Sequence, residues 1–272
     1  MSAKCEPSVS MEMIRDTSSS PELSPLAIGE DLAPLQELKA AGTTDFGFSG
    51  LLEKPLRLHE DLKSGCGGQL WPAGMVLAKH MLRYHPDLRQ SRILEIGSGG
   101  GLVGLAVASG CAIASENPLW MTDQLEMLPL MQRNTQANGL EGKVKPAILN
   151  WGEPLAGDIV ALKPDVILAA DCVYHEPAFP LLLATLSDLL ALCPTATIYF
   201  AYKKRRRAGM QFFKRARKAF HVAEIMEDED RTVFNREGIF LYAITGKASG
   251  FPTTACGASQ EAIGDVVKHD HD

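Results

Sequence analysis

The chain has 272 residues, and its hydrophobic content of 46% is enough for the core of one α/β domain. Its formal net charge of −6 resides in the two ends, because residues 41–245 carry equal numbers of basic and acidic side chains. A neutral middle argues against a nucleic-acid-binding surface, and no apolar run reaches the ~18 residues that a membrane span needs.

The six cysteines are scattered and form no C-x-x-C pair. This spacing indicates neither a zinc site nor a disulfide framework, so we expect no metal and a reducing compartment. The N-terminal segment lacks the apolar core of a signal peptide. We therefore expect a cytoplasmic protein.

Both ends of the chain differ in composition from the middle. Residues 1–40 are rich in Ser, Pro and Glu, and residues 28–38 among them are compatible with a short helix. Residues 246–272 consist largely of Gly, Ala, Ser, Thr and acidic residues. Such segments bury too little apolar surface to fold. The sequence predicts two disordered tails around one domain at residues 41–245.

The domain begins with a loosely alternating apolar pattern over residues 46–58, which predicts a β-hairpin with its turn near residues 53–55. A glycine-rich loop follows and ends at Trp71. Pro72 fits the first position of a helix that we expect to continue to Tyr84. Trp71 therefore lies at a helix entrance, beside a glycine loop.

The rest of the chain is organised around a strand, a glycine turn and a helix. Residues 93–96 predict a buried strand, residues 97–101 contain four glycines, and residues 102–108 favour a helix. Glycine is needed where φ is positive or where a ligand approaches the backbone closely. The start of a helix leaves N–H groups free for such a ligand.

Two motifs overlap at this turn. Gly99, Gly101 and Gly104 match G-x-G-x-x-G, which is typical of dinucleotide-binding dehydrogenases. Glu95, Gly97 and Gly99 match acidic-x-Gly-x-Gly, which resembles the first motif of the seven-strand S-adenosylmethionine-dependent methyltransferases. A carboxylate at the strand end suits a cofactor with a cationic amino-acid end. The turn alone leaves both cofactors open.

Helices and strands alternate through residue 220, which predicts a doubly wound α/β sheet. The last two strands pair antiparallel, so the fold class is Rossmann-like with seven strands. The strands after the first are expected at residues 118–122, 145–149, 165–170, 195–202, 221–226 and 239–245.

Polar and aromatic residues follow the ends of these strands. Asp123 ends the second strand, where nucleotide-binding folds place the carboxylate that takes ribose hydroxyls. Trp151 lies in the loop after the third strand, at the edge where ligands bind. It can contact an adenine ring or pack onto the core.

Asp171 and Tyr174 follow the fourth strand and suit methyl transfer to an amine. A lysine has a reference pKa of about 10.4 and must lose a proton before it can attack. A carboxylate can orient the amine, and a tyrosine can line a lysine channel. A strand-end aspartate that only caps the next turn is the structural alternative.

The segment 171–174, Asp-Cys-Val-Tyr, resembles the Asp-x-x-Tyr motif of the seven-strand protein-lysine methyltransferases, also called methyltransferase family sixteen. The resemblance covers roughly residues 44–245. Residues 168–174, 176–183 and 201–206 are similar to members that methylate a lysine of translation elongation factor 1-alpha. The resemblance implies that the cofactor is S-adenosylmethionine and that the protein substrate is elongation factor 1-alpha.

The resemblance also implies roles for particular residues. Asp171 and Tyr174 become the substrate-side pair, and Glu95 joins the cofactor site from its place at the strand end. One residue departs from the family pattern: Gly100 stands where the motif Gly-Ser-Gly-Thr-Gly more usually has Thr or Ala. The implied cofactor site comprises Trp71, Gly97, Ser98, Gly99, Asp123, Trp151 and Ala170.

Three alternatives remain. A methyltransferase acting on nucleic-acid amines usually has two prolines in this motif, and both are absent. A non-catalytic binding module would have no need for the glycine turn and Asp171. A dehydrogenase leaves Glu95, Trp151 and the Asp171–Tyr174 pair unexplained.

A run of five basic residues spans 203–207. It can be a solvated surface, a nuclear or nucleic-acid signal, or a dock for an acidic face of the protein substrate. The sequence shows no coiled-coil repeat, so we expect a monomer.

Overall fold

The computed structural model describes residues 42–61, 68–205 and 207–247 of the protein. Residues 1–40, with the helix expected at 28–38, lie outside these ranges, as does the predicted C-terminal tail from residue 248 onward. Gly246, which we expected to begin that tail, is instead the last residue of a strand.

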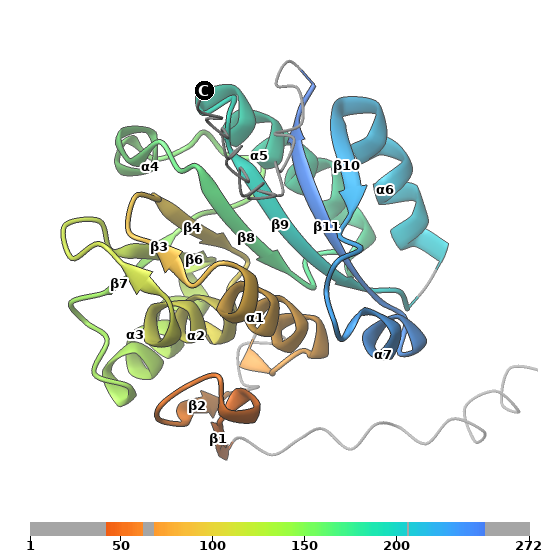
Figure 1. Ribbon diagram of the computed structural model, residues 1–272. Helices are drawn as coiled ribbons and strands as arrows, with labels where there is room; N and C mark the ends of the chain where they lie inside the picture. Colours follow the sequence, from red (N-terminus) through yellow and green to blue (C-terminus); the bar gives the residue numbers. More distant parts are fainter. Residues whose placement is uncertain (1–41, 62–67, 206, 248–272) are drawn as a thin grey trace, which may run out of the picture. The chain divides into compact units, whose positions relative to one another are not determined.

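Seven of the described strands form one sheet in the order β10-β11-β9-β8-β4-β6-β7 (Figure 1). Strands β4 to β9 of this sheet are parallel, and β11 runs antiparallel to both β9 and β10. The predicted doubly wound fold with an antiparallel last strand is confirmed. The strands are β4 (Ile93–Ile96), β6 (Leu119–Asp123), β7 (Val144–Ile148), β8 (Val166–Ala170), β9 (Thr197–Lys203), β10 (Phe220–Glu224) and β11 (Ile239–Gly246).

Helices cover both faces of the sheet, with α1, α2 and α3 on one face and α4, α5 and α6 on the other (Figure 1). Each face has its own buried cluster, which includes Leu77 and Met121 on the first and Leu186 and Phe200 on the second. The helices are α1 (Pro72–Tyr84), α2 (Leu102–Gly110), α3 (Leu128–Ala137), α4 (Gly157–Leu162), α5 (Phe179–Leu192) and α6 (Arg207–Ala219).

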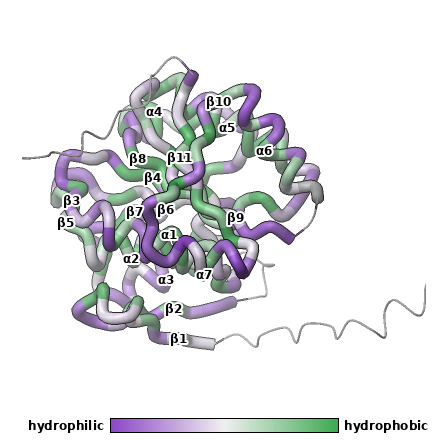
Figure 2. The backbone as a smooth tube through the Cα atoms, turned by 45° about the vertical axis from the view of Figure 1, so that its right-hand side comes forward, coloured by the Kyte–Doolittle hydropathy of each residue, from purple (hydrophilic) through white to green (hydrophobic). Residues whose placement is uncertain are grey.

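The central strands are hydrophobic along their length, whereas the N-terminal hairpin is largely hydrophilic (Figure 2). Strands buried on both faces require such continuous apolar runs. Side chains alternate between the two clusters, so Leu94 faces the second cluster while Ile93 faces the first. This alternation directs Glu95 toward α2.

The strand order reverses between β4 and β8, because the chain winds outward from β4 to β7 and then returns to β8. Ligands of doubly wound sheets bind in the crevice at the carboxyl ends of such a pair of strands. The glycine turn after β4 and Asp171 after β8 lie at this point.

The N-terminal hairpin consists of β1 (Gly42–Phe46) and β2 (Leu56–Glu60), paired antiparallel. The two strands are separated by a longer stretch of sequence than the alternation predicted, because the buried residues Phe48 and Leu52 belong to the connection between them and not to a strand. The side chain of Asn134 on α3 accepts a hydrogen bond from the His59 N–H (2.8 Å) and donates one to the Gly100 carbonyl (2.8 Å). The hairpin thus supports the glycine turn.

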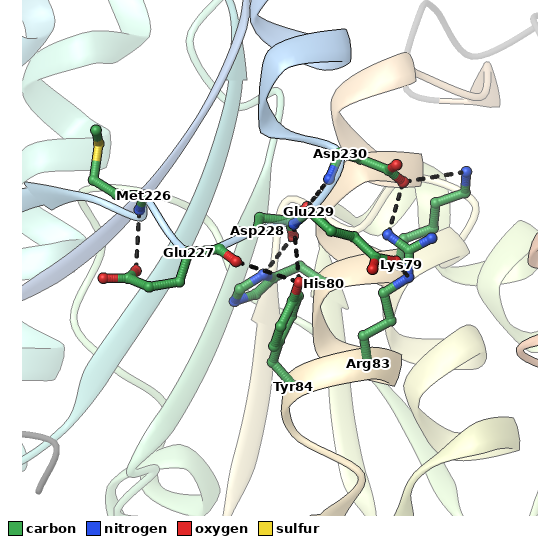
Figure 3. Close-up of polar contacts among 9 residues, drawn as sticks. All are labelled: Lys79, His80, Arg83, Tyr84, Met226, Glu227, Asp228, Glu229 and Asp230. Carbon is green, nitrogen blue, oxygen red and sulfur yellow. Dashed lines mark hydrogen bonds and ion pairs between the residues drawn. The ribbon is translucent and has the colours of Figure 1, made fainter. Parts of the chain in front are cut away.

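The segment between β10 and α7 (Arg231–Arg236) is tied to α1 by several polar contacts (Figure 3). His80 Nδ1 lies 2.8 Å from Asp228 Oδ2, and both side chains are buried. Arg83 donates to Asp230 (2.7 Å), and the Glu229 N–H donates to the Tyr84 hydroxyl (2.9 Å). These contacts fix the C-terminal half of α1.

The sequence did not predict the shortest elements, which are α4, α7, the two-residue strands β3 (Asp87–Leu88) and β5 (Ala112–Ile113), and the 3₁₀ turns η2 (Phe48–Gly50), η4 (Leu125–Met127) and η5 (Glu176–Ala178). In the described part of the chain, every helix is too short or too polar to cross a membrane.

Candidate active site

A cavity of about 270 Å³ opens at the carboxyl ends of β4, β6 and β8. It is close to the lower end of the size range of small-molecule sites. All ten residues selected from the sequence line this one cavity: Trp71, Glu95, Gly97, Ser98, Gly99, Asp123, Trp151, Ala170, Asp171 and Tyr174.

The glycine turn forms the floor of the cavity. Gly97 has φ +60°, and a Cβ added there would come within 2.8 Å of Trp151 Cζ2. The Gly99 N–H donates to Asp123 Oδ2 (2.7 Å), and the Ser98 N–H donates to the Thr122 carbonyl (3.0 Å). The turn therefore needs glycine at Gly97 both for its backbone and for the approach of the indole.

Glu95 has a buried carboxyl group on the cavity wall, and only 2% of the residue is exposed. It accepts a hydrogen bond from the Gly104 N–H (2.9 Å), and a Cβ at Gly104 would lie 2.5 Å from the same oxygen. Burial raises the pKa of Glu95 to about 8, the negative charge of Asp123 contributes in the same direction, and the Gly104 N–H opposes them.

Asp123 is the second carboxyl group of the cavity. Burial raises its pKa and the charge of Glu126 adds to this effect, although the N–H groups of Gly99 and Gln124 both donate to its carboxylate and lower the pKa. Two desolvated carboxyl groups on one wall favour a ligand that brings a cation or several hydroxyl groups.

Two tryptophans border the cavity. Trp151 lies after β7 and packs against the second hydrophobic cluster with part of its surface exposed. Trp71 directly precedes Pro72 at the start of α1. Ala170, the last residue of β8, also lines the cavity and occupies little of it because its side chain is small.

Asp171 lies directly after β8, with φ +56°, a conformation uncommon for a residue with a Cβ. Its N–H donates to the Ala201 carbonyl of β9 (2.8 Å). Both carboxylate oxygens accept hydrogen bonds from Arg205, at 2.7 Å and 2.6 Å. The Arg205 guanidinium also lies over the Trp71 ring, 4.8 Å from its centroid.

Sequence reasoning did not assign Arg205 to the site, because the arginine lies within the basic run at 203–207. In the structure, neighbouring residues of this run have different surroundings. The Lys204 side chain is exposed to solvent, whereas the Arg205 guanidinium pairs with the Asp171 carboxylate. The available signal was position: β8 and β9 are parallel neighbours, so the residues that follow them meet at one edge of the sheet.

Tyr174 is 56% exposed and lines the mouth of the cavity. Its ring lies beside that of His175, with centroids 6.4 Å apart. The sequence also missed several lining residues, because their types occur throughout any α/β core: Leu70, Val103, Met127, Leu149 and Cys172.

Comparisons with known proteins identify the family of this chain. Residues 51–219 match the family described as lysine methyltransferase. The protein-lysine N-methyltransferase EFM6 of Saccharomyces cerevisiae is 35% identical over 237 residues, which cover 80% of this chain and 96% of that protein.

Two animal proteins are also similar. The EEF1A lysine methyltransferase 3 of Mus musculus is 33% identical over 172 residues, covering 62% of this chain and 70% of that protein. The protein N-lysine methyltransferase METTL21A of Danio rerio is 31% identical over 186 residues, covering 65% and 80%. With a family match over more than half of its length and a full-length relative of the same description, this chain belongs to the lysine methyltransferase family.

Proposed function

We propose that this protein methylates a lysine of translation elongation factor 1-alpha. It would use S-adenosylmethionine bound in the cavity where the strand order reverses, between β4 and β8. The observation that carries the proposal is that one cavity joins the glycine turn, two buried carboxyl groups, two tryptophans and the Asp171–Tyr174 pair. Methyl transfer to lysine requires a cofactor site and an amine site side by side, and this cavity offers both.

The residues of the cavity fit S-adenosylmethionine on chemical grounds. Glu95 offers a carboxylate to the cationic amino-acid end, and Asp123 offers one to the ribose hydroxyls. Gly97 keeps the backbone open where Trp151 lies on the turn, so the indole can pack against adenine. Ser98 and Gly99 shape the turn that borders the cofactor, because their N–H groups and the Ser98 hydroxyl (3.1 Å) already donate to Thr122 and Asp123.

When bound, the cofactor supplies an electrophilic methyl group on a sulfonium. The chain holds and orients the attacking amine. Asp171 is the polar anchor for the substrate lysine, and Tyr174 borders the channel through which it enters. Trp71 and Ala170 shape the passage between the two subsites. Alignment of two bound reactants can supply ~7–11 kcal/mol of the barrier.

The substrate assignment rests on the relatives. The mouse protein is named for EEF1A, and the yeast relative that spans most of this chain is named a protein-lysine N-methyltransferase. We also propose that the enzyme acts in the cytoplasm as a monomer. The described cysteines, Cys111, Cys172 and Cys193, are free thiols, which suits a reducing compartment.

The test is mass spectrometry after incubation of the purified protein with S-adenosylmethionine and unmodified elongation factor 1-alpha. We expect a mass gain of one or more methyl groups on one lysine, and loss of this gain with Asp171→Ala. Cofactor binding without methyl transfer would redirect the search to another protein substrate. Absence of cofactor binding would contradict the proposed site.

A further inference from the structure

The carboxylate proposed to receive the substrate lysine already has a cationic partner. The side chain of Asp171 is only 2% exposed, whereas that of Arg205 is 33% exposed. Arg205 forms the bidentate pair with both oxygens, and the Lys203 N–H adds a longer contact to Oδ1 (3.3 Å). Asp171 therefore enters the reaction as one half of an ion pair.

The arginine is held in this place from several sides. Its guanidinium lies over Trp71, and the Lys204 N–H donates to the Gly238 carbonyl (2.7 Å), which fixes the backbone next to it. Planar bidentate pairs of arginine and carboxylate have a fixed geometry. The positive charge thus belongs to the architecture of the site.

This charge matters because the attacking group is an amine. An isolated carboxylate beside a lysine stabilises the ammonium form and raises its pKa, which opposes the formation of the nucleophile. A guanidinium bonded to the same carboxylate cancels that field and repels a second cation. An amine that reaches Asp171 would lie within a few ångströms of the guanidinium, where unscreened charges interact strongly.

We propose that Arg205 is a positioning residue of the methyl-transfer site, which neutralises Asp171 so that the bound substrate lysine loses its proton near physiological pH. Asp171 then orients a neutral amine as a hydrogen-bond acceptor. The proton leaves to solvent through the mouth beside exposed Tyr174. This inference rests on the proposed function of the cavity.

The test is the pH dependence of kcat at saturating elongation factor 1-alpha and S-adenosylmethionine, which reports ionisations in the substrate complex. With Arg205→Gln, the acidic limb of the profile should move upward by about 1–2 pH units, with kcat recovering at alkaline pH. Arg205→Lys keeps the positive charge, so its limb should stay close to that of the wild type.

Two further variants separate charge from structure. Adding Asp171→Asn to Arg205→Gln removes both charges and should return the limb toward the wild-type position, although at a lower maximal rate. Lys204→Gln is the matched control, since it removes a neighbouring positive charge that faces solvent. It should leave the limb unchanged.

A uniform loss of kcat at every pH with Arg205→Gln would show a merely structural role and overturn the inference. An unmoved limb with a lower KM for the protein substrate would show that the guanidinium competes with the lysine, and would overturn it as well. A wild-type enzyme that binds cofactor but methylates nothing at any pH would instead overturn the proposed substrate, and the inference with it.

Discussion

In the proposed cofactor site, the ionisation of one residue, Glu95, should be coupled to cofactor binding. Its pKa of about 8 means that the empty protein holds this group largely protonated at pH 7. A cationic ligand binds the ionised form, so binding at pH 7 should release a proton. We expect the affinity for S-adenosylmethionine to rise up to about tenfold per pH unit below pH 8 and to level off above it.

Calorimetry in two buffers of different ionisation enthalpy measures this proton release directly. Glu95→Gln should weaken binding and remove the part of the pH dependence that comes from Glu95, because it keeps the shape of the side chain but cannot ionise. Asp123, whose pKa is also raised, would contribute any pH dependence that remains. An affinity independent of pH in the wild type would contradict the role of Glu95.

The glycine turn offers a second test at the scale of one residue. Gly97→Ala adds a Cβ that meets Trp151 and Cys172 at 2.8 Å and 2.9 Å, at a positive φ. We expect the variant to fold and to lose cofactor affinity by at least about tenfold, or ~1.4 kcal/mol, measured by titration.

Gly139→Ala is the matched control for this change. Gly139 also has a positive φ, of +64°, but a Cβ there has no atom within 4 Å. It should cost ~1 kcal/mol of stability and leave cofactor binding intact. Equal loss of binding in both variants would assign the effect to backbone strain alone.

At this scale the sequence predicted much of the cavity, because its residues follow the ends of recognisable strands. Asp123, Trp151 and Asp171 each come within a few residues of an apolar run, and a doubly wound sheet brings such positions together. Position after β9 indicates that the basic run lies at the same edge, but it does not single out Arg205. Its pairing depends on which of several adjacent basic side chains turns inward, and only the packing of β9 against β8 decides that.

Among the helices, α1 connects the cavity to the far edge of the sheet. Its first turn follows Trp71 at the cavity, and its last turns contact the segment before α7 (Figure 3). Asp228→Ala would leave the buried His80 ring without its carboxylate partner and should cost ~1–3 kcal/mol in the free energy of unfolding. Denaturant unfolding measures this loss.

Asp230→Ala is the appropriate comparison, since its side chain is 40% exposed where it pairs with Arg83. This pair is only partly exposed, but Arg83 keeps Glu229 as a second partner, so the variant should lose less stability than Asp228→Ala. Similar losses in both variants would indicate that the whole segment, rather than the buried pair, holds α1.

The long elements were predictable because their hydrophobic pattern is strong and their ends carry clear signals, such as Pro72 before α1 and Asn138-Gly139 after α3. The short ones were not. Helix α7, Arg-Thr-Val-Phe-Asn-Arg, buries one residue, Phe234, and no periodicity can be recognised from a single position. The hairpin boundaries shifted because Phe48 and Leu52 are buried by the irregular connection and not by a strand.

For the whole molecule, two buried groups make the stability depend on pH in opposite directions. The pKa of Glu95 rises from 4.5 to about 8 on folding, so folding takes up a proton and stability increases as pH falls from 8 toward 4.5. Burial, with the charge of His80, lowers the pKa of His85 from 6.5 to about 4. The unfolded state then binds the extra proton, and stability decreases as pH falls from 6.5 toward 4.

Each proton changes the free energy of unfolding by about 1.4 kcal/mol per pH unit within its window. We therefore expect stability to rise as pH falls from 8 to 6.5, where Glu95 acts alone, and to stay level between 6.5 and 4.5, where the two effects cancel. Asp123 and the more exposed His59 add smaller effects, of the Glu95 sign and the His85 sign respectively. Denaturant unfolding across this range without cofactor measures the profile.

Single substitutions separate the two contributions. With His85→Gln, stability should continue to rise down to about pH 4.5, because only the Glu95 proton remains. With Glu95→Gln, the rise below pH 8 should vanish and stability should fall below pH 6.5. Saturating S-adenosylmethionine should act like Glu95→Gln on the alkaline side, since a bound cation keeps Glu95 ionised. A profile that the cofactor leaves unchanged would show that the cation does not reach this carboxylate, and would place the amino-acid end elsewhere in the cavity.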